Sequence, residues 1–319
     1  MFASPRSSRP ASLPRSRRGR ASAWFVVIVS LALLAVFIGH RVIRGTLGTV
    51  VAAALPWLGL LLPVLLLVAL VARRPRAALV VLAPAVAWSL IFVPHLVPLT
   101  PPTTAAPSGT IVAASQNVEV SSGTAAESAL GLVDAGADVI ALVELSTDAS
   151  AEAAAALADT HPYSYVVGTL GVWSVFPIRN EQPLTLGLSW KRAITLDVET
   201  EAGLVSIYAV HAASFRPGEQ VDRDVMLNNL AEMVKNDPNE RAIILGDFNA
   251  TSDDPALSRL YEYAVEANQS DISLGFTWPT IFPVARIDHI FAVGLDPVES
   301  TVRRVGHSDH LAVIATFNL

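Results

Sequence analysis

Three long apolar runs occupy most of the first hundred residues. They cover Ala21–Gly39, Gly45–Ala72 and Ala77–Val93, and none of them contains a charged side chain. Crossing the hydrocarbon layer of a bilayer takes about 20 apolar helical residues at ~1.5 Å rise each. The sequence therefore predicts a membrane anchor over residues 21–98, with three transmembrane helices at about residues 21–39, 48–72 and 77–97. The third run is short, and a buried helix of a soluble domain or a re-entrant segment is its alternative interpretation.

Charged residues divide the chain into two parts. Residues 1–104 contain 11 Arg and no Lys, Asp or Glu, whereas residues 105–319 contain the other 11 Lys and Arg and all 28 Asp and Glu, for a net charge of −17. Six of the arginines lie in the tail before the first run, and three lie in the loop 73–76. By the positive-inside rule both segments are cytoplasmic, so the chain after Leu99 is expected outside the cytoplasm of a multi-pass cell-membrane protein.

Two segments beside the anchor have the composition of flexible chain. Residues 1–20 are rich in Ser, Pro and Arg and are predicted to form a disordered basic cytoplasmic tail. Residues 99–109 form a Pro- and Thr-rich linker that is too short to let a following domain move far from the bilayer. The Ser16-Arg17-Arg18 sequence before an apolar run also resembles a twin-arginine export signal, which would give the same location.

Residues 110–319 alternate between strand-like and helix-like patterns, which is typical of an α/β domain. We expect strands near residues 110–118, 139–143, 163–167, 171–175, 184–189, 193–198, 204–211, 242–245, 287–293 and 311–317. Helices are expected at residues 125–134, 149–159 and 218–235. In the last of these, Val221, Val225, Leu227, Leu230, Met233 and Val234 share one face. Asp254 before Pro255 predicts an N-cap and a further helix through Tyr263.

Polar side chains stand at or beside the ends of these expected strands. They are Asn117, Glu144, His211, Asp247, Asn249, Asp288 and His310. Open α/β sheets place their sites at such an edge, so these side chains are expected to converge. The carboxylate and amide oxygens of Glu119, Glu144, Asp247, Asp309 and Asn249 suit a hard cation such as Mg²⁺, Mn²⁺ or Ca²⁺.

The histidines add a second kind of chemistry. His211 and His310 end or precede strands, and Asp288 could orient and charge an imidazole as a dyad. A protonated histidine stabilises the negative charge of a phosphoryl transition state while a metal polarises the phosphoryl oxygen. The chain has no cysteine, no G-x-S-x-G and no P-loop sequence, so a thiolate zinc site, a serine esterase and a P-loop enzyme have no support.

Six short motifs follow one another in a fixed order. They are SQNVE at 115–119, VELS at 143–146, VHAAS at 210–214, GDFNAT at 246–251, RIDHIFA at 286–292 and HSDHLAV at 307–313. Together they resemble the motif series of the endonuclease/exonuclease/phosphatase superfamily, the fold of deoxyribonuclease I, over about residues 110–319. TWP at 277–279 is similar to a bacterial subgroup with N-terminal membrane helices. The resemblance implies an α/β (α+β) fold, a four-layer sandwich of two packed β-sheets flanked by helices, preceded here by the three transmembrane helices.

The resemblance also implies a role for each matched position. Glu144 corresponds to the metal-binding glutamate, with Glu119 and Asp309 as further acidic ligands, and Asn117 supports phosphate and metal. Asp247 and Asn249 activate and position the attacking water or steady the phosphate. His211 contacts phosphate or acts as an acid, and Asp288 and His310 form the dyad. The implied reaction is hydrolysis of a phosphoester with Mg²⁺, or with Mn²⁺.

Net charge bears on the substrate. Binding of nucleic acid is largely electrostatic, and the part of the chain with a net charge of −17 has no basic run, so a nuclease is less favoured than a hydrolase of a small phosphoester or a lipid headgroup. The sequence predicts a membrane-anchored phosphodiesterase or phosphatase. An extracytoplasmic nuclease is one alternative. A catalytically weak ligand-binding ectodomain is another, because Val143 and Val175 stand where the family usually has Gln and Arg. The sequence indicates no protein partner.

Overall fold

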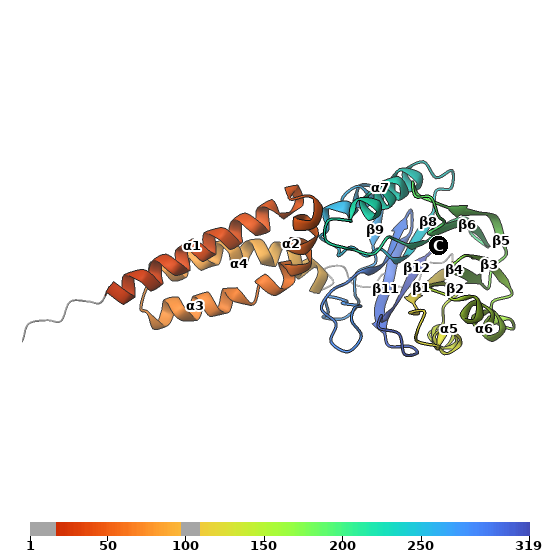
Figure 1. The fold of residues 1–319 in the computed structure, drawn as a ribbon, viewed down its shortest axis with the longest axis horizontal. Helices are drawn as coiled ribbons and strands as arrows, with labels where there is room; N and C mark the ends of the chain where they lie inside the picture. The colour runs from red at the N-terminus through yellow and green to blue at the C-terminus, as the bar shows by residue number, and fades with distance from the viewer. Residues whose placement is uncertain (1–16, 97–108) are drawn as a thin grey trace, which may run out of the picture. The chain divides into compact units, whose positions relative to one another are not determined.

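The computed structural model describes residues 17–96 and 109–319, which form two compact units. The first unit comprises residues up to Gly39 and Leu55–Leu90, and the second comprises His40–Ala54 and Ile91–Leu319. The predicted linker, apart from Gly109, and residues 1–16 of the predicted tail lie outside the described residues. Figure 1 shows the elements of both units.

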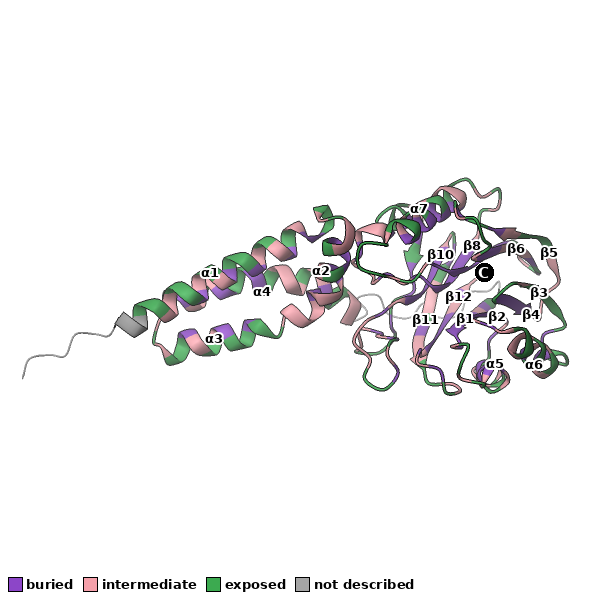
Figure 2. Cartoon of the chain, in the orientation of Figure 1, coloured by how far each residue is buried: buried purple, intermediate pink, exposed green. Residues whose placement is uncertain are grey.

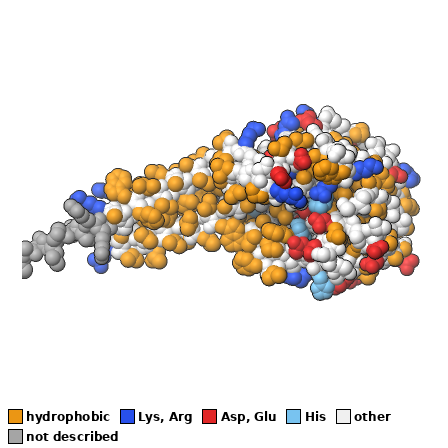
Figure 3. All heavy atoms as spheres, in the orientation of Figure 1, with side chains coloured by type: hydrophobic (Ala, Val, Ile, Leu, Met, Phe, Trp, Pro, Cys, Tyr) orange, Lys and Arg blue, Asp and Glu red, His pale blue; other side chains and the backbone are white. Residues whose placement is uncertain are grey.

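Helices alone form the apolar N-terminal part. They are α1 (Arg17–Gly39), a 3₁₀ turn η1 (His40–Val42), α2 (Gly45–Leu58), α3 (Leu61–Val71) and α4 (Pro75–Leu96). Among the described residues, two segments are long and apolar enough to cross a membrane, Arg20–Val42 and Pro75–Leu96. Side chains such as Leu90, 74% exposed, and Ile38, 72% exposed, leave an apolar surface on these helices (Figures 2 and 3). The third apolar run, the shortest in the sequence, therefore forms a helix of full spanning length.

The middle apolar run departs from its prediction. It forms two helices, α2 and α3, that meet at an angle of 53°, so it counts as a span only if the bent pair is taken together. The predicted helix over residues 48–72 is therefore broken in two, and the described residues contain two unbroken candidate spans, or three spans if the bent pair is one. Pro56 and Pro63 lack the amide hydrogen that a continuous helix needs on either side of the break, and the Leu60 amide instead donates to Trp57 O at 3.0 Å.

Two six-stranded sheets form the second unit. In spatial order the first contains β11 (Asp296–Arg303), β12 (Ala312–Asn318), β1 (Thr110–Asn117), β2 (Val139–Val143), β4 (Leu170–Ser174) and β3 (Tyr163–Val167). The second contains β5 (Ile178–Leu184), β6 (Ala193–Thr200), β7 (Gly203–His211), β8 (Ala242–Asp247), β10 (Asp288–Val293) and β9 (Val265–Glu266). The neighbours β1–β2 and β7–β8 are parallel, and the other paired strands are antiparallel. Each parallel pair needs a crossover, which α5 (Ala125–Asp134) and α7 (Val221–Lys235) supply.

Helices cover the outer face of each sheet (Figure 1). α5 (Ala125–Asp134) and α6 (Thr147–Leu157) pack on the first sheet, and α7 (Val221–Lys235) packs on the second. Strand β2 is buried on both faces, because its alternate residues Val139, Ala141 and Val143 join the core between the sheets while Ile140 and Leu142 pack beneath the helices. The predicted four-layer sandwich is confirmed.

The structure also corrects several element predictions. Residues 184–189, expected as a strand, form mainly a turn, and the strand is instead the polar segment IRNEQPL of β5. Asp254 does act as an N-cap, since its side chain accepts from the Ala256 amide at 2.9 Å, but only two 3₁₀ turns follow, at Pro255–Leu257 and Leu260–Glu262. In α7 the buried face carries Arg223, while Val221 and Val225 are exposed.

Candidate active site

The site lies at one edge of the sandwich, where strands of both sheets carry polar side chains at their ends. In the first sheet Asn117 ends β1, Glu144 follows β2 and His310 precedes β12, which runs antiparallel to β1. In the second sheet His211 ends β7 beside Asp247, the last residue of β8, and Asp288 begins the antiparallel β10 opposite Asp247. The ends of the parallel strands and the starts of their antiparallel neighbours thus lie at one edge. This topology brings together side chains that are up to 193 positions apart in the sequence.

Asn117 joins the two sheets through its amide. Its Nδ2 donates to Glu144 Oε1 and to Asp247 Oδ2, both at 3.0 Å. Its Oδ1 accepts from the Glu119 amide at 3.0 Å, and its carbonyl accepts from Ser308 Oγ at 2.6 Å. One buried amide therefore fixes the separation of a carboxylate of the first sheet from a carboxylate of the second.

The GDFN segment supplies one feature at each position. Any other residue at position 246 would place its Cβ 1.9 Å from Val210 O. The backbone φ of 141° at Gly246 is also one that residues with a side chain rarely adopt. Phe248 is buried against the His289 ring, with centroids 5.4 Å apart. Asn249 turns back with a φ of 49°, so that its amide N–H donates to Asp247 Oδ1 at 2.8 Å and its Nδ2 donates to Ala212 O at 3.1 Å.

Asp288 and His310 form the predicted dyad geometry. His310 Nδ1 lies 2.8 Å from Asp288 Oδ2, and both side chains are buried. Burial disfavours a charged ring, but the Asp288 carboxylate, with Asp247 and Asp309 nearby, outweighs it and raises the pKa of His310 to about 10. The imidazole is therefore protonated at neutral pH and presents Nε2–H as a donor.

His211 differs from His310 in its protonation. Burial, together with the positive charges of Arg192 and His310, lowers the pKa of His211 to about 3. The neutral ring has Nε2 3.4 Å from Glu144 Oε1 and 3.9 Å from Asp247 Oδ2, and neither ring nitrogen has a hydrogen-bond partner among the described residues. A buried ring without partners, aimed at two carboxylates, fits a site that takes a further group.

The carboxylates are close enough to share a cation. Donor atoms of Glu144, His211 and Asp247 lie within 4.8 Å of one another, as do those of Asp247, Asp288 and His310. Burial and the nearby Asp288 carboxylate raise the pKa of Asp247 to about 7. Because oxygen donors predominate and Asp288 Oδ1 is buried without a hydrogen-bond partner, these residues fit a hard divalent cation.

Two predicted metal ligands lie apart from these clusters. Glu119 Oε2 accepts from the Asp309 amide at 3.1 Å, and Asp309 Oδ2 accepts from Trp278 Nε1 at 2.9 Å. Neither carboxylate belongs to either cluster, although Asp309 Oδ1 comes within 3.9 Å of His310 Nε2. Their role as ligands stays a prediction, and in this structure they brace the rim of the site beside His310.

A cavity of about 440 Å³ opens onto the site. Its polar lining includes Asn117, Glu144, Asp247, Asn249 and His310. Its apolar lining includes Val50 and Ala53 of α2 together with Phe215, Trp278 and Ile287. The first turns of α2 are therefore part of the cavity wall, which no pattern in the predicted anchor had indicated.

The sequence interpretation also missed two arginines. Arg192 lies close enough for its charge to act on His211, Glu144 and Asp247, and its Nη2 donates to Ala212 O at 3.3 Å. Arg223 is buried and donates to Asn249 O at 3.0 Å and to Thr49 Oγ1 at 2.9 Å. The available signal for Arg223 was its spacing, because it stands four residues before Leu227 on the face of α7 that packs inward.

A family model agrees with this geometry. The model of the Endonuclease/Exonuclease/phosphatase family matches residues 114–310, which run from β1 to His310. The chain belongs to this family. Its members hydrolyse phosphoester bonds, usually with a divalent metal. No curated protein matches the chain significantly.

Solved structures share the fold at low sequence identity. Truncated TDP2 of Caenorhabditis elegans is 19% identical with a TM-score of 0.56, covering 66% of this chain and 98% of its own. TDP2 of D. rerio, solved with a single-strand DNA product, is 17% identical with a TM-score of 0.56, covering 66% of this chain and 100% of its own. Beta toxin of Staphylococcus aureus is 15% identical with a TM-score of 0.53, covering 64% of this chain and 99% of its own. These similarities establish the fold of the second unit.

Proposed function

We propose that this chain is a membrane-anchored hydrolase that uses a divalent cation to cleave a small phosphoester or a lipid headgroup outside the cytoplasm. The observation that carries the proposal is the meeting of Glu144, Asp247 and His310 in one cavity of a chain of this family. Glu144 would hold the cation, Mg²⁺ or Mn²⁺, with Asp247 and His211 as neighbouring donors. Such a cation, when bound, supplies Lewis-acid polarisation of a phosphoryl oxygen.

The remaining roles follow from protonation. Asp247 accepts a proton from the attacking water, and Asn249 fixes the carboxylate by its backbone amide. His310, protonated and held by Asp288, donates to a phosphoryl oxygen as negative charge develops there. Arg192 adds positive charge near a site in which the family's usual Arg is replaced by Val175.

The cavity wall supports an amphiphilic substrate. Val50, Ala53 and Phe215 line the cavity together with the carboxylates, so a phosphoester with an apolar portion finds partners for both of its parts. The net charge of −17 after residue 104 opposes a long polyanion. A lipid headgroup with part of its glyceride has both a phosphoester and an apolar portion, and it is not a long polyanion.

Contacts of the first loop support the location. The loop and the start of α2 belong to the second unit, where His40 Nε2 lies 3.9 Å from Asp253 Oδ1 and Thr46 Oγ1 donates to Gln220 Oε1 at 2.8 Å. The loop and the catalytic residues thus belong on one side of a bilayer. The positive-inside rule gives that side as the outside, because the tail and the loop 73–76 carry more arginines.

The test is hydrolysis by the purified full chain with Mg²⁺. Phospholipid in mixed micelles, a bis-nitrophenyl phosphodiester and plasmid DNA are compared, with Asp247→Ala and His310→Ala as inactive variants and His307→Ala, at an exposed ring, as the control. We expect phospholipid or the small diester to be cleaved and each inactive variant to lose at least ~10²-fold of turnover. Cleavage of plasmid alone would favour the nuclease; the structurally similar D. rerio TDP2 was solved with a single-strand DNA product. No cleavage of any substrate would favour the ligand-binding ectodomain.

A further inference from the structure

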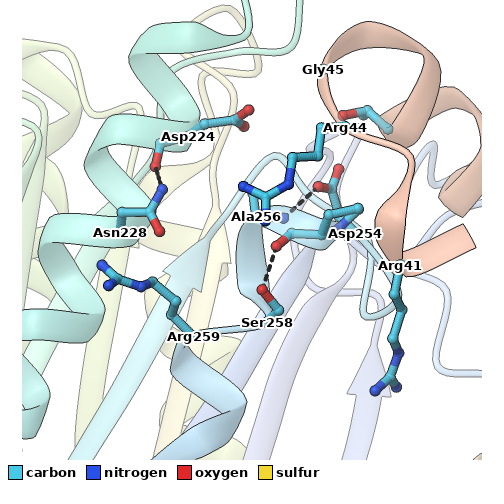
Figure 4. Close-up of a pocket in the computed structure, with 11 residues that line it drawn as sticks. Arg41, Arg44, Gly45, Asp224, Asn228, Asp254, Ala256, Ser258 and Arg259 are labelled. Carbon is cyan, nitrogen blue, oxygen red and sulfur yellow. Dashed lines mark hydrogen bonds between the residues drawn. The ribbon is translucent and has the colours of Figure 1, made fainter.

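A second cavity, of about 490 Å³, lies beside the start of α2 (Figure 4). Three arginines contribute to its lining: Arg41 and Arg44 from the loop before α2, and Arg259 from the segment between the two 3₁₀ turns. In Figure 4 Arg44 and Arg259 come from different elements, and the Arg41 side chain points away from both. This cavity shares only Thr49 with the lining of the catalytic cavity.

The two acidic side chains of this cavity share one buried guanidinium. Asp224 Oδ1 lies 2.7 Å from Arg223 Nη2, and Asp254 Oδ2 lies 3.2 Å from Arg223 Nη1. Arg223 is itself buried, and it pairs with both carboxylates. The two carboxylates and the one buried guanidinium leave a single negative charge, so the three lining arginines give the cavity a net positive charge.

The guanidinium groups are available to a ligand. Arg44 makes no hydrogen bond or ion pair with another described residue, and it is exposed. Arg259 has only a surface ion pair, with Nη1 3.2 Å from Glu232 Oε1 and both side chains about half exposed, and such pairs contribute little. Arginine presents a planar fork of donors that matches the oxygens of a phosphate group.

The position of the loop in the chain indicates the source of the phosphate. Arg41 and Arg44 follow within a few residues of Gly39, the last residue of apolar α1. Arginines at the end of a spanning helix lie at the level of the lipid headgroups. The loop is also held firmly, because Thr46 Oγ1 accepts from the Gly218 amide at 3.0 Å and Arg223 binds Thr49.

We infer that this cavity is a non-catalytic site for the phosphate group of an anionic phospholipid, gripped by Arg44 and Arg259. The inference rests on the membrane anchoring in the proposed function. A lipid bound there stands against the helix whose next turn, at Val50 and Ala53, lines the catalytic cavity.

The test is retention of lipid by the full chain. The protein is reconstituted into nanodiscs of phosphatidylcholine with phosphatidylglycerol, in EDTA so that metal-dependent hydrolysis cannot consume the lipid, and native mass spectrometry counts the phosphatidylglycerol retained on release. The double variant R44Q/R259Q is compared with R179Q/R303Q, which removes two exposed arginines outside the cavity. We expect the wild type and the control to retain phosphatidylglycerol over phosphatidylcholine, and R44Q/R259Q to lose at least about tenfold of this affinity.

Three outcomes overturn the inference or its source. Equal losses in both double variants, or no preference in the wild type, mean that no specific site exists. Binding of inorganic phosphate or deacylated headgroup to the detergent-solubilised chain, abolished by R44Q/R259Q but without lipid retention, means a site for a free phosphate. Failure of the chain to enter bilayers overturns the anchoring and is seen before any lipid is compared. Hydrolysis is measured separately with Mg²⁺, so failure of the catalytic proposal is distinguishable.

Discussion

His310 Nδ1 lies 2.8 Å from Asp288 Oδ2, and this buried contact joins the first β-sheet to the second at the edge where the active site lies. His310 precedes β12, which pairs with β1 in the first sheet, and Asp288 begins β10, which pairs with β8 in the second sheet. Their pairing keeps the imidazole charged and points its other nitrogen toward the cavity. The site therefore combines a protonated donor with a set of carboxylates around it.

The dyad predicts an unequal effect of two substitutions. Asp288→Asn keeps the shape of the side chain but removes the charge that holds the imidazolium, so we expect turnover to fall by ~10²-fold or more. His289→Gln changes the adjacent residue, whose ring instead binds Glu266 and Ala250 O, and we expect it to act on stability more than on kcat. The check is to measure kcat and the free energy of unfolding for both variants. A D288N enzyme with wild-type kcat would contradict the dyad.

Glu266 forms buried ion pairs with Arg286 and His289, and these pairs predict that stability depends on pH. Burial opposes ionisation of Glu266, but Arg286 and His289 outweigh it and hold the pKa of this carboxyl well below its usual range. Because the pKa of Glu266 is lowered in the folded protein, its ionised carboxylate contributes to the free energy of unfolding. This contribution is complete above about pH 4.5, the ordinary pKa of the group, and is lost as the pH falls toward the folded-state pKa. Glu266→Gln leaves Arg286 buried without its partner, at 2.8 Å from Nε to Oε1, and we expect a loss of about 3–5 kcal/mol at pH 7.

Urea unfolding at pH 7 and pH 4 checks this prediction. The difference in unfolding free energy between the wild type and E266Q should shrink at the lower pH, because the wild type begins to lose the contribution there. A difference that is constant or grows as pH falls would show that Glu266 is not ionised in the folded protein.

Gly246 predicts a failure to fold. Its Cβ would overlap Val210 O, where β7 and β8 pair in parallel, so Gly246→Ala should leave no stable second unit. Gly123→Ala is the matched control, because φ there is also positive, at 64°, but nothing lies within 4 Å of the added Cβ. Circular dichroism and thermal unfolding separate the two, and the control is expected to lose only about 1 kcal/mol. A G246A protein as stable as G123A would refute the close approach.

The link through Arg223 predicts that α2 affects catalysis. Thr49→Val removes the hydroxyl that accepts from Arg223 Nη2, and the same guanidinium holds Asn249 O. We expect a loss of about 1 kcal/mol in stability and a several-fold fall in kcat/KM. Thr46→Val also removes contacts of the first turn of α2, to Gln220 and Gly218, but does not touch Arg223. Equal kinetics in the two variants would limit Thr49 to a structural role.

Much of the site could be predicted because its residues stand where local patterns end. Asn117, Glu144 and Asp247 each follow a run of apolar residues typical of a buried strand, so the pattern indicates both the strand and its functional end. Arg223, Arg192 and Thr49 could not be predicted in this way. Each reaches the site from a helix, or from beside a strand, through a contact between segments that are distant in the sequence.

The missed elements share a physical reason as well. β5 and β11 are edge strands with polar residues on an exposed face, so neither has the apolar alternation that marks a strand. The break between α2 and α3 lies in a run that is uniformly apolar, where hydropathy gives no boundary and only Pro56 and Pro63 hint at one.

Binding of a divalent cation by the carboxylate cluster is the central claim, and it is measured most directly by titrating Mn²⁺ into the full chain and following free Mn²⁺ by electron paramagnetic resonance. The wild type is expected to bind Mn²⁺, to release it to excess Mg²⁺ and to unfold at a higher temperature when the ion is present, because the cation neutralises the carboxylates gathered around Asp247. The variant E144Q/D247N should bind at least ~10²-fold more weakly, while D271N, at an exposed carboxylate, should bind like the wild type. Mn²⁺ binding that is unchanged in E144Q/D247N would contradict the account.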